Sequence, residues 1–249
     1  MTSEILPDLI GKPILGFLPA LCEANPSISH LRLETYKPIS GLWKRLKEHW
    51  PIVNSEIGQQ AEIIAKDSLL PAWNHFAHLA LKRGCTLEQS MVNAVIDQHS
   101  NPPSTVVDIS RERVLEGALS KIVADFPAGL GVVVCSNILT TSGEALRIPM
   151  MDFLCKISES SQSAIAAFVR AGELTPAVIV NSGQSYHVYG MRLLTEKEWI
   201  QFLANSLLFA PITDARYIGH RLREMEFKLK VRSENGEVPH IVGIVSSDL

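Results

Sequence analysis

The stretch Asn181-Ser-Gly-Gln-Ser-Tyr-His-Val-Tyr189 joins a short glycine turn to a strand with alternating side chains. The turn is predicted at Ser182-Gly183, and the strand over residues 185–192. Because side chains alternate across a strand, Ser185 and His187 share one face, two residues apart. A hydroxyl beside an imidazole suits phosphate oxygens, since the hydroxyl and a suitably protonated histidine can each donate a hydrogen bond. The spacing alone is more often that of an ordinary Ser-His pair on the solvent face of a strand.

On both sides of this stretch, the hydrophobic period alternates between that of helices and that of short strands. We expect helices over residues 111–126, 158–171, 195–207 and 214–225, and strands over residues 105–109, 131–139, 145–153, 176–181, 227–232 and 240–246. Thr195-Glu-Lys-Glu198 is a capping box that begins one of these helices. This order of elements predicts an α+β domain in which helices cover one side of a mostly antiparallel sheet.

The first hundred residues have a different pattern. Residues 70–82 carry a mostly apolar face at helical spacing, and Thr86-Leu-Glu-Gln89 is typical of a capping box that begins another helix. The clearest break in the chain is the polar, proline-containing stretch His99-Ser-Asn-Pro-Pro-Ser104. We therefore predict a helical N-terminal region over residues 1–104 and an α/β core over residues 105–249.

The composition bounds the class of protein. With 249 residues, 46% of them hydrophobic and 20% charged, the chain is expected to fold as a globular protein. The net charge of −3 excludes a uniformly basic nucleic-acid binder, so positive charge for binding phosphate has to be local. The four cysteines form no CxxC pair, which argues against a structural zinc site or a disulfide framework. No membrane span or secretory signal is evident, and we expect a cytoplasmic protein.

A single carboxylate interrupts an apolar strand. Asp152 lies near the end of the strand predicted over residues 145–153. An unpaired charge buried there would cost several kcal/mol, so Asp152 is expected at an exposed edge, beside a cation or on a metal. A helix N-cap or a solvent-facing strand end explains the same residue equally well.

Positive charge collects near the C-terminus, after an isolated Asp214. The basic residues at helical spacing are Arg216, His220 and Arg223, and those that alternate onto one face of the next strand are Lys228, Lys230 and Arg232. Such stripes are more often solvated faces than phosphate sites.

The order of these three patterns resembles the catalytic core of the archaeo-eukaryotic primase, or primase-polymerase, superfamily. In that family the first motif is an acidic pair, the second is Ser-x-His, and the third is a further aspartate. Ser185-Tyr-His187 matches the second motif closely, while Asp152 and Asp214 match acids of the first and third. The resemblance runs from Leu146 to Ser246 and implies a primase-like core, with a mostly antiparallel sheet and RRM-like βαβ elements.

The resemblance also implies roles for these residues. Asp152 and Asp214 would be the catalytic acids and would hold Mg²⁺ or Mn²⁺, while Ser185 and His187 would contact the triphosphate of a nucleotide. The cations that would neutralise phosphate are His220, Arg221 and Arg232. Nucleoside triphosphate and nucleic acid would be the partners, with no membrane involved. Such chemistry depends mainly on positioning and on stabilising charge on phosphate oxygens.

One acid of the family pattern is missing, because Leu154 stands two residues after Asp152 and is followed by Lys156. Three functions remain open: a nucleotidyltransferase that synthesises a DNA or RNA strand, an inactive relative that binds nucleotide or nucleic acid, and a protein-interaction factor acting through its helical N-terminal half. The distance between Asp152 and Asp214 tests whether the two acids can share one metal ion. Beyond about 10 Å no single ion can contact both, since Mg–O bonds are about 2 Å long.

Overall fold

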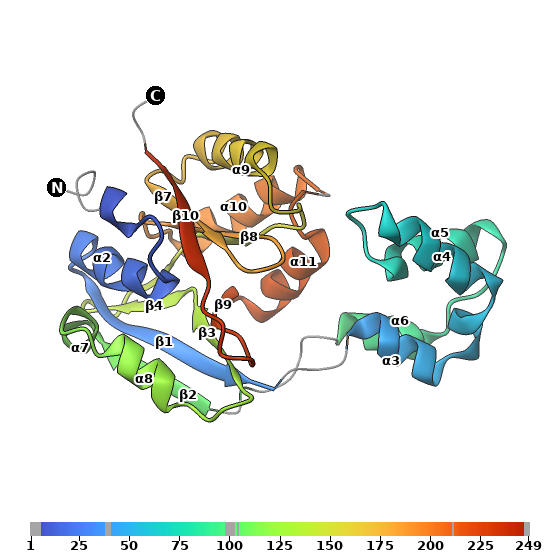
Figure 1. Cartoon of the computed structure of the whole chain (residues 1–249), viewed down its shortest axis with the longest axis horizontal. Coiled ribbons are helices and arrows are strands. Elements are labelled where there is room, and N and C mark those ends of the chain that lie inside the picture. Colours follow the sequence, from blue (N-terminus) through green and yellow to red (C-terminus); the bar gives the residue numbers. More distant parts are fainter. Residues whose placement is uncertain (1–5, 38–40, 98–102, 104, 211, 247–249) are drawn as a thin grey trace. The chain divides into compact units, whose positions relative to one another are not determined.

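A computed structural model describes residues 6–37, 41–97, 103, 105–210 and 212–246. The chain divides into two compact units, one formed by residues 1–38 with 103–249 and the other by residues 39–102. The larger unit contains two β-sheets with helices packed on them, whereas every regular element described in the smaller unit is a helix. Figure 1 labels these elements along the chain.

This division differs from the predicted boundary after residue 104. The predicted helical region contains β1 (Ile28–Tyr36), which pairs with β2 (Thr105–Ser110) and with two further strands of the larger unit. Thr35 and Thr105 are register partners in the antiparallel pair, so the smaller unit is an insertion between β1 and β2. A single strand within a long run of helical periodicity was too weak a signal to reveal this connection.

The first sheet has the strand order β5-β4-β1-β3-β9, with β2 paired to β1 outside this path. Its remaining strands are β3 (Gly131–Cys135), β4 (Asn137–Thr140), β5 (Ala145–Arg147) and β9 (Lys228–Arg232). All of its strand pairs are antiparallel. The buried face carries Leu31, Leu33, Val132, Val134, Leu229 and Val231. The opposite face, here called the charged face, carries Arg32, Glu34, Cys135, Lys228 and Lys230.

Two short helices follow β2, where a single helix over residues 111–126 was predicted. They are α7 (Arg111–Leu115) and α8 (Leu119–Asp125), which Figure 1 labels. Their apolar side chains join the same core as the buried face of the first sheet. Gly117 interrupts the helix because its φ of 80° lies in the left-handed region, where glycine is favoured. The helical content was therefore predicted correctly, but its continuity was not.

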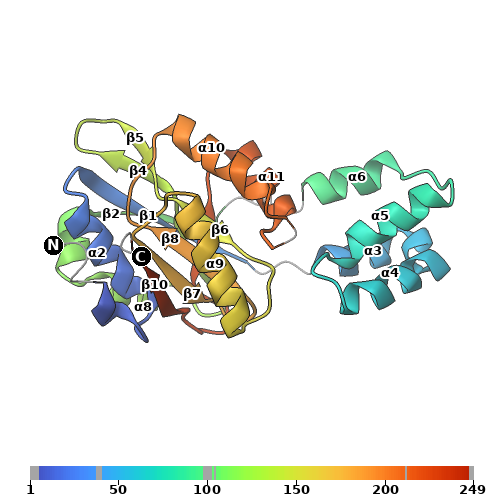
Figure 2. The ribbon, with the colours of Figure 1, turned by 90° about the horizontal axis from the view of Figure 1, so that it is seen from above.

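The second sheet has the strand order β10-β7-β8-β6. Its strands are β6 (Met150–Asp152), β7 (Ala177–Asn181), β8 (Tyr186–Gly190) and β10 (His240–Val245). The helices of this half are α9 (Glu159–Ala171), α10 (Glu196–Leu207) and α11 (Ala215–Glu224). Figure 2 shows α9 lying across the sheet, and the Tyr186 hydroxyl bonds to the backbone of Ser158, the N-cap of this helix. The capping box Thr195–Glu198 is present as predicted.

The α+β class with antiparallel pairing is confirmed, but the predicted single sheet is two sheets. The chain crosses from the first sheet to the second between β5 and β6, so the strand predicted over residues 145–153 is divided. Pro149 lies at the crossing and lacks the N–H that a continuous ladder needs. As a result, the register of β6, and of Asp152 at its end, is set by β8.

The smaller unit packs around its own apolar core. Its elements are α3 (Leu42–His49), a 3₁₀ turn (Pro51–Asn54), α4 (Glu56–Lys66), α5 (Ala72–Lys82) and α6 (Gln89–Ile96). The helix predicted over residues 70–82 corresponds to α5, while α6 begins at Gln89 without the predicted capping box.

The remaining elements of the larger unit are 3₁₀ turns at Pro7–Leu9 and Ile14–Gly16 and helix α2 (Phe17–Ala24). None of the described helices is long and apolar enough to cross a membrane.

Candidate functional site

The Ser-x-His pair lies where a glycine turn enters β8. Gly183 has a φ of 98°, and its N–H donates to Asn181 Oδ1 at 2.8 Å. The Ser182 N–H donates to the Ser185 carbonyl at 3.0 Å, which closes the turn. Ser185 is half-buried and precedes the strand, whereas His187 lies within it and is only 6% exposed. The strand therefore begins one residue later than predicted, and the hydroxyl belongs to the turn.

The structure brings Asp152, His187 and Asp214 together. Asp152 is the register partner of His187, and His187 Nε2 lies 3.5 Å from Asp152 Oδ1. The Asp214 N–H donates to the Asp152 carbonyl at 3.4 Å, next to a bridge between Phe153 and Thr213. Residues from three separate segments thus meet at the end of β6.

Burial controls the charge of this group. It raises the pKa of Asp152 to about 7, with a further increase from the negative charge of Asp214. Burial also lowers the pKa of His187 to about 3, and the positive charge of Lys230 lowers it further. His187 is therefore neutral at neutral pH, and its contact with Asp152 is not a full ion pair. His187 Nδ1 is buried and has no hydrogen-bond partner in the described part of the chain.

Asp214 also caps a helix. Its Oδ1 accepts a hydrogen bond from the Tyr217 N–H at 2.9 Å, which satisfies a free donor of the first turn of α11. A carboxylate is favourable at this end of a helix dipole. One carboxylate oxygen is thus committed to the backbone, and the other is available for a ligand.

The cations predicted to bind phosphate are buried or have other partners. The Arg232 guanidinium donates to the carbonyls of Val123, Phe126, Pro127 and Leu130. Arg221 pairs with Glu224 at 2.9 Å, lies over the Tyr217 ring and is 4% exposed. His220 is 7% exposed, and burial lowers its pKa, followed by the charge of Arg221. Arg221 and Arg232 therefore stabilise local structure in this conformation.

Two other cations adjoin the acids. The charge of Lys230 lowers the pKa values of both Asp152 and His187, so its ammonium group lies near them. Burial lowers the pKa of Arg216, and the nearby charge of Asp214 partly opposes this. Among the described residues, neither Lys230 nor Arg216 forms an ion pair. The sequence placed both in basic stripes, but spacing could not show which members remain unpaired.

The donor set suits one divalent ion and not two. Asp152 and Asp214 provide two neighbouring carboxylates, and the desolvated Asp152 would become fully charged with a cation beside it. Leu154, at the position of the missing acid, offers no side-chain ligand. Within the described chain, these acids and His187 do not form a group of three ligands within 4.8 Å of one another. Phosphate oxygens and water would have to complete the coordination of Mg²⁺.

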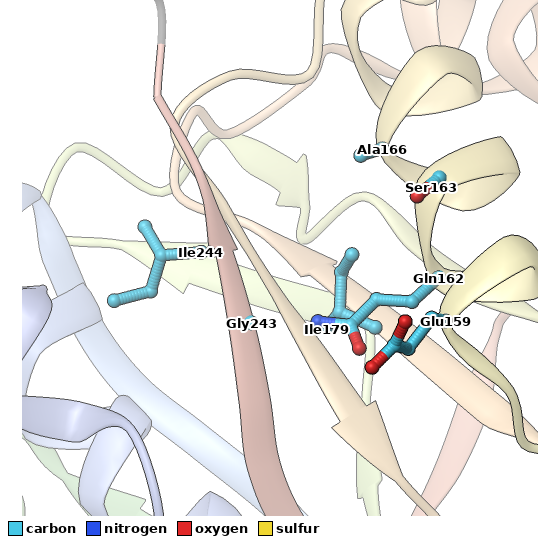
Figure 3. Close-up of a pocket in the computed structure, with 7 residues that line it drawn as sticks. All are labelled: Glu159, Gln162, Ser163, Ala166, Ile179, Gly243 and Ile244. Atoms are coloured by element: carbon cyan, nitrogen blue, oxygen red, sulfur yellow. The ribbon is translucent and has the colours of Figure 1, made fainter.

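A hollow of about 250 Å³ lies apart from this group, between α9 and β10 (Figure 3). Gln162 crosses it and donates to the Val242 carbonyl at 3.0 Å, at an irregularity in the ladder between β10 and β7. Gly243 leaves room for this contact, because a Cβ atom there would lie 2.5 Å from Gln162 Nε2. The hollow is thus explained by the packing of α9 on the edge strand.

The chain matches a known protein family. A family model described as AEP-like, archaeo-eukaryotic primase 1D-like, matches residues 113–242. The match runs from α7 into β10, includes Asp152, Ser185, His187 and Asp214, and excludes the inserted helical unit. Comparisons with curated proteins and with solved structures find no match.

Proposed function

Because the chain belongs to the archaeo-eukaryotic primase 1D-like family, we propose that it binds the phosphate groups of a nucleotide or nucleic acid beside β8. The observation that supports this most strongly is the register pair of Asp152 and His187, placed directly behind the glycine turn that carries Ser185. A neutral histidine and a hydroxyl donate hydrogen bonds to phosphate oxygens without needing a charge of their own.

The positive charge for this site comes from Lys230 and Arg216 in our proposal. Both lie near the acids, and within the described residues neither is held by an ion pair. A bound phosphate would be the counter-ion of both side chains. Charge-assisted hydrogen bonds to phosphate are stronger than neutral ones. The predicted ligands Arg221 and Arg232 are not part of this proposal, since other groups already engage them.

We further propose that Asp152 and Asp214 hold one Mg²⁺ or Mn²⁺ ion together with the bound phosphate. Such an ion would supply charge neutralisation on the phosphate oxygens. Burial raises the pKa of Asp152 and the charge of Asp214 raises it further, and a cation between the two carboxylates would stabilise the charged form of both. Ser185 and His187 would then fix the orientation of the phosphate from β8.

Binding without strand synthesis is the function that this residue set supports best. A two-metal displacement needs ligands for both ions, and Leu154 removes one of them. Nucleotidyl transfer is the second candidate, because Asp152, Asp214 and the Ser-x-His pair are all retained and grouped.

Binding is tested by fluorescence anisotropy with a labelled nucleoside triphosphate and a labelled single strand, each in Mg²⁺ and in EDTA. We expect Lys230→Ala to weaken binding about tenfold, since one charge-assisted contact of 1.4 kcal/mol corresponds to that factor. Lys121→Ala is the matched control, because Lys121 is an exposed lysine on α8. Absence of binding in wild type, or equal losses in both variants, would refute the proposal.

Synthesis is tested separately by incorporation of labelled nucleotides on primed and unprimed templates with Mg²⁺ or Mn²⁺. We expect no extension product from a wild-type protein that binds nucleotide. Product that disappears in both Asp152→Ala and Asp214→Ala would instead establish the second candidate.

A further inference from the structure

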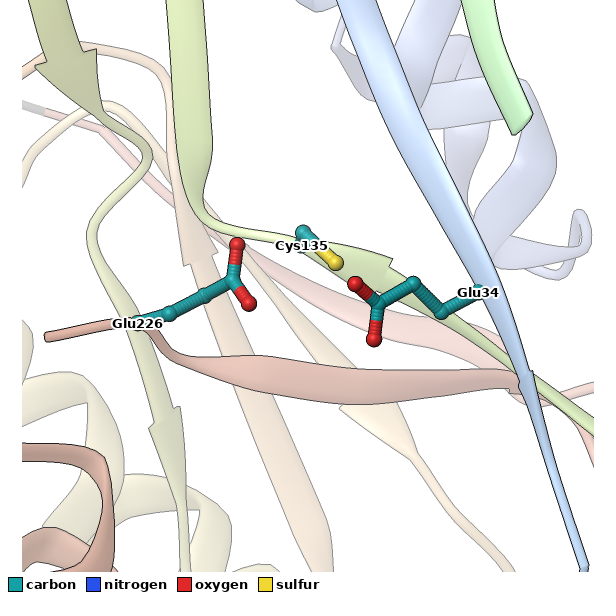
Figure 4. Close-up of side chains that lie close together, drawn as sticks. All are labelled: Glu34, Cys135 and Glu226. Atoms are coloured by element: carbon teal, nitrogen blue, oxygen red, sulfur yellow. The ribbon is translucent and has the colours of Figure 1, made fainter. Parts of the chain in front are cut away.

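The charged face of the first sheet contains a compact set of metal-ligating side chains that the proposed function does not use. Glu34 comes from β1, Cys135 from the end of β3, and Glu226 from the segment just before β9, and all three point toward one another (Figure 4). One ligand atom from each lies within 4.8 Å of the other two. Cys135 is fully buried and Glu34 is 6% exposed. Two adjacent strands and the segment that leads into a third therefore hold the set.

A positive charge already lies against both carboxylates. Lys228 Nζ is 2.6 Å from Glu34 Oε2 and 3.1 Å from Glu226 Oε2. Lys228 is also the register partner of Cys135 across β3 and β9. The Lys228 ammonium group is therefore the counter-ion of both carboxylates in this structure.

The internal cation leaves the set incompletely neutralised. Two carboxylates and one ammonium carry a net charge of −1, and Arg32, the next cation on this face, is bound to Asp108 at 2.8 Å. A divalent ion on both carboxylates and the deprotonated thiol of Cys135 also leaves a net charge of −1, so exchanging the ammonium and one proton for the ion keeps the charge constant and adds a metal–sulfur bond. The thiol of Cys135 remains protonated in the absence of a metal, because burial and the two glutamates raise its pKa.

We propose that Glu34, Cys135 and Glu226 form a binding site for a thiophilic divalent metal such as Zn²⁺, which the Lys228 ammonium fills when no metal is bound. Binding would release the thiol proton of Cys135 to solvent and turn Lys228 outward, where 23% of its side chain is already exposed. Cysteine sulfur and glutamate oxygen are ordinary zinc ligands, and water can complete a four-coordinate site. The ligand chemistry separates this site from the Asp152 group, since Mg²⁺ prefers oxygen ligands alone.

The test uses metal-free full-length protein titrated with Co²⁺, because a thiolate ligand gives a near-ultraviolet charge-transfer absorption that oxygen ligands do not. We expect this absorption to saturate at one equivalent in wild type, to vanish in Cys135→Ala and to persist in Cys22→Ala, the control for a buried thiol elsewhere. Lys228→Met removes the competing ammonium and is expected to tighten Co²⁺ binding at least about tenfold, or 1.4 kcal/mol.

Circular dichroism identifies variants that do not fold, and Glu34→Gln then provides a second variant with an expected loss of affinity. The proposal is overturned if wild type shows no thiolate absorption or if the absorption survives in Cys135→Ala. It is also overturned if the absorption occurs in Lys228→Met alone, since Lys228 would then be the sole native occupant. Phosphate binding is measured separately, so failure here leaves the proposed function standing.

Discussion

His187 Nε2 lies 3.5 Å from Asp152 Oδ1, across a register pair that joins β8 to the last residue of β6. The approach is set by the backbone ladder of a sheet and not by a loop, so the two side chains are held near each other before any ligand arrives. A carboxyl group with a pKa of about 7 and a neutral imidazole make a site whose charge changes near neutral pH.

The first prediction concerns pH. In EDTA, we expect affinity for a labelled nucleoside triphosphate to fall as the pH rises through about 7, because Asp152 ionises beside the phosphate. In Mg²⁺ we expect the opposite trend, because a carboxylate must lose its proton to bind metal. Anisotropy titrations across this range measure both trends. Asp152→Asn should abolish the contribution of Asp152, and identical pH profiles for wild type and Asp152→Asn would contradict the assignment.

The raised pKa of Asp152 also makes the stability of the fold depend on pH. Asp152 has a higher pKa in the folded state than in the unfolded chain, where it is near 3.8, so the folded state holds more protons between these values. The contribution of Asp152 to stability is therefore greatest at low pH and is lost as the pH rises toward about 7. Urea unfolding at a series of pH values should show this loss in wild type and not in Asp152→Asn. If the free energy of unfolding falls with pH no more steeply in wild type than in Asp152→Asn, the raised pKa of Asp152 is contradicted.

A third prediction separates the two kinds of cation. Lys230→Ala should weaken phosphate binding while leaving the unfolding midpoint nearly unchanged. Arg232→Ala should do the reverse and lower the free energy of unfolding by about 2 kcal/mol, since it removes several charged hydrogen bonds to partly buried carbonyls. Denaturant unfolding and anisotropy on the same samples check both results. Loss of affinity at full stability in Arg232→Ala would restore the role that the sequence suggested.

The missing acid gives a fourth prediction. Leu154→Asp adds a carboxylate two residues after Asp152 and should strengthen Mn²⁺ binding about tenfold, equivalent to 1.4 kcal/mol. Leu154→Asn is the control, because asparagine has nearly the same shape as aspartate but carries no charge. Calorimetric titration of Mn²⁺ into each variant measures the difference. Equal affinities for the two variants would show that position 154 does not face the metal.

The fifth prediction concerns the inserted helical unit. Thr35 and Thr105 are register partners, so a short glycine-serine linker from Lys37 to Pro103 should reconnect β1 and β2 as a hairpin. We expect the shortened chain to unfold cooperatively and to bind labelled triphosphate with unchanged affinity. Loss of binding in a shortened chain that still folds would assign a part of the site to residues 39–102.

The sequence by itself determined the local features of this protein. The glycine turn before His187, the capping box at Thr195 and the helix over residues 158–171 are all present, because each depends on hydrogen bonds and periodicity among neighbouring residues. The α+β class and the family follow from the order of such elements.

Only the tertiary structure decided which of the charged residues are paired. Lys228 and Glu34 are 194 positions apart, and they form an ion pair because β1 and β9 both flank β3. Arg232 bonds to carbonyls around the turn after α8 for a similar reason, which leaves Lys230 as the cation near Asp152. Spacing along a chain fixes which face a side chain occupies, but the partner on that face comes from strands that the local sequence does not specify.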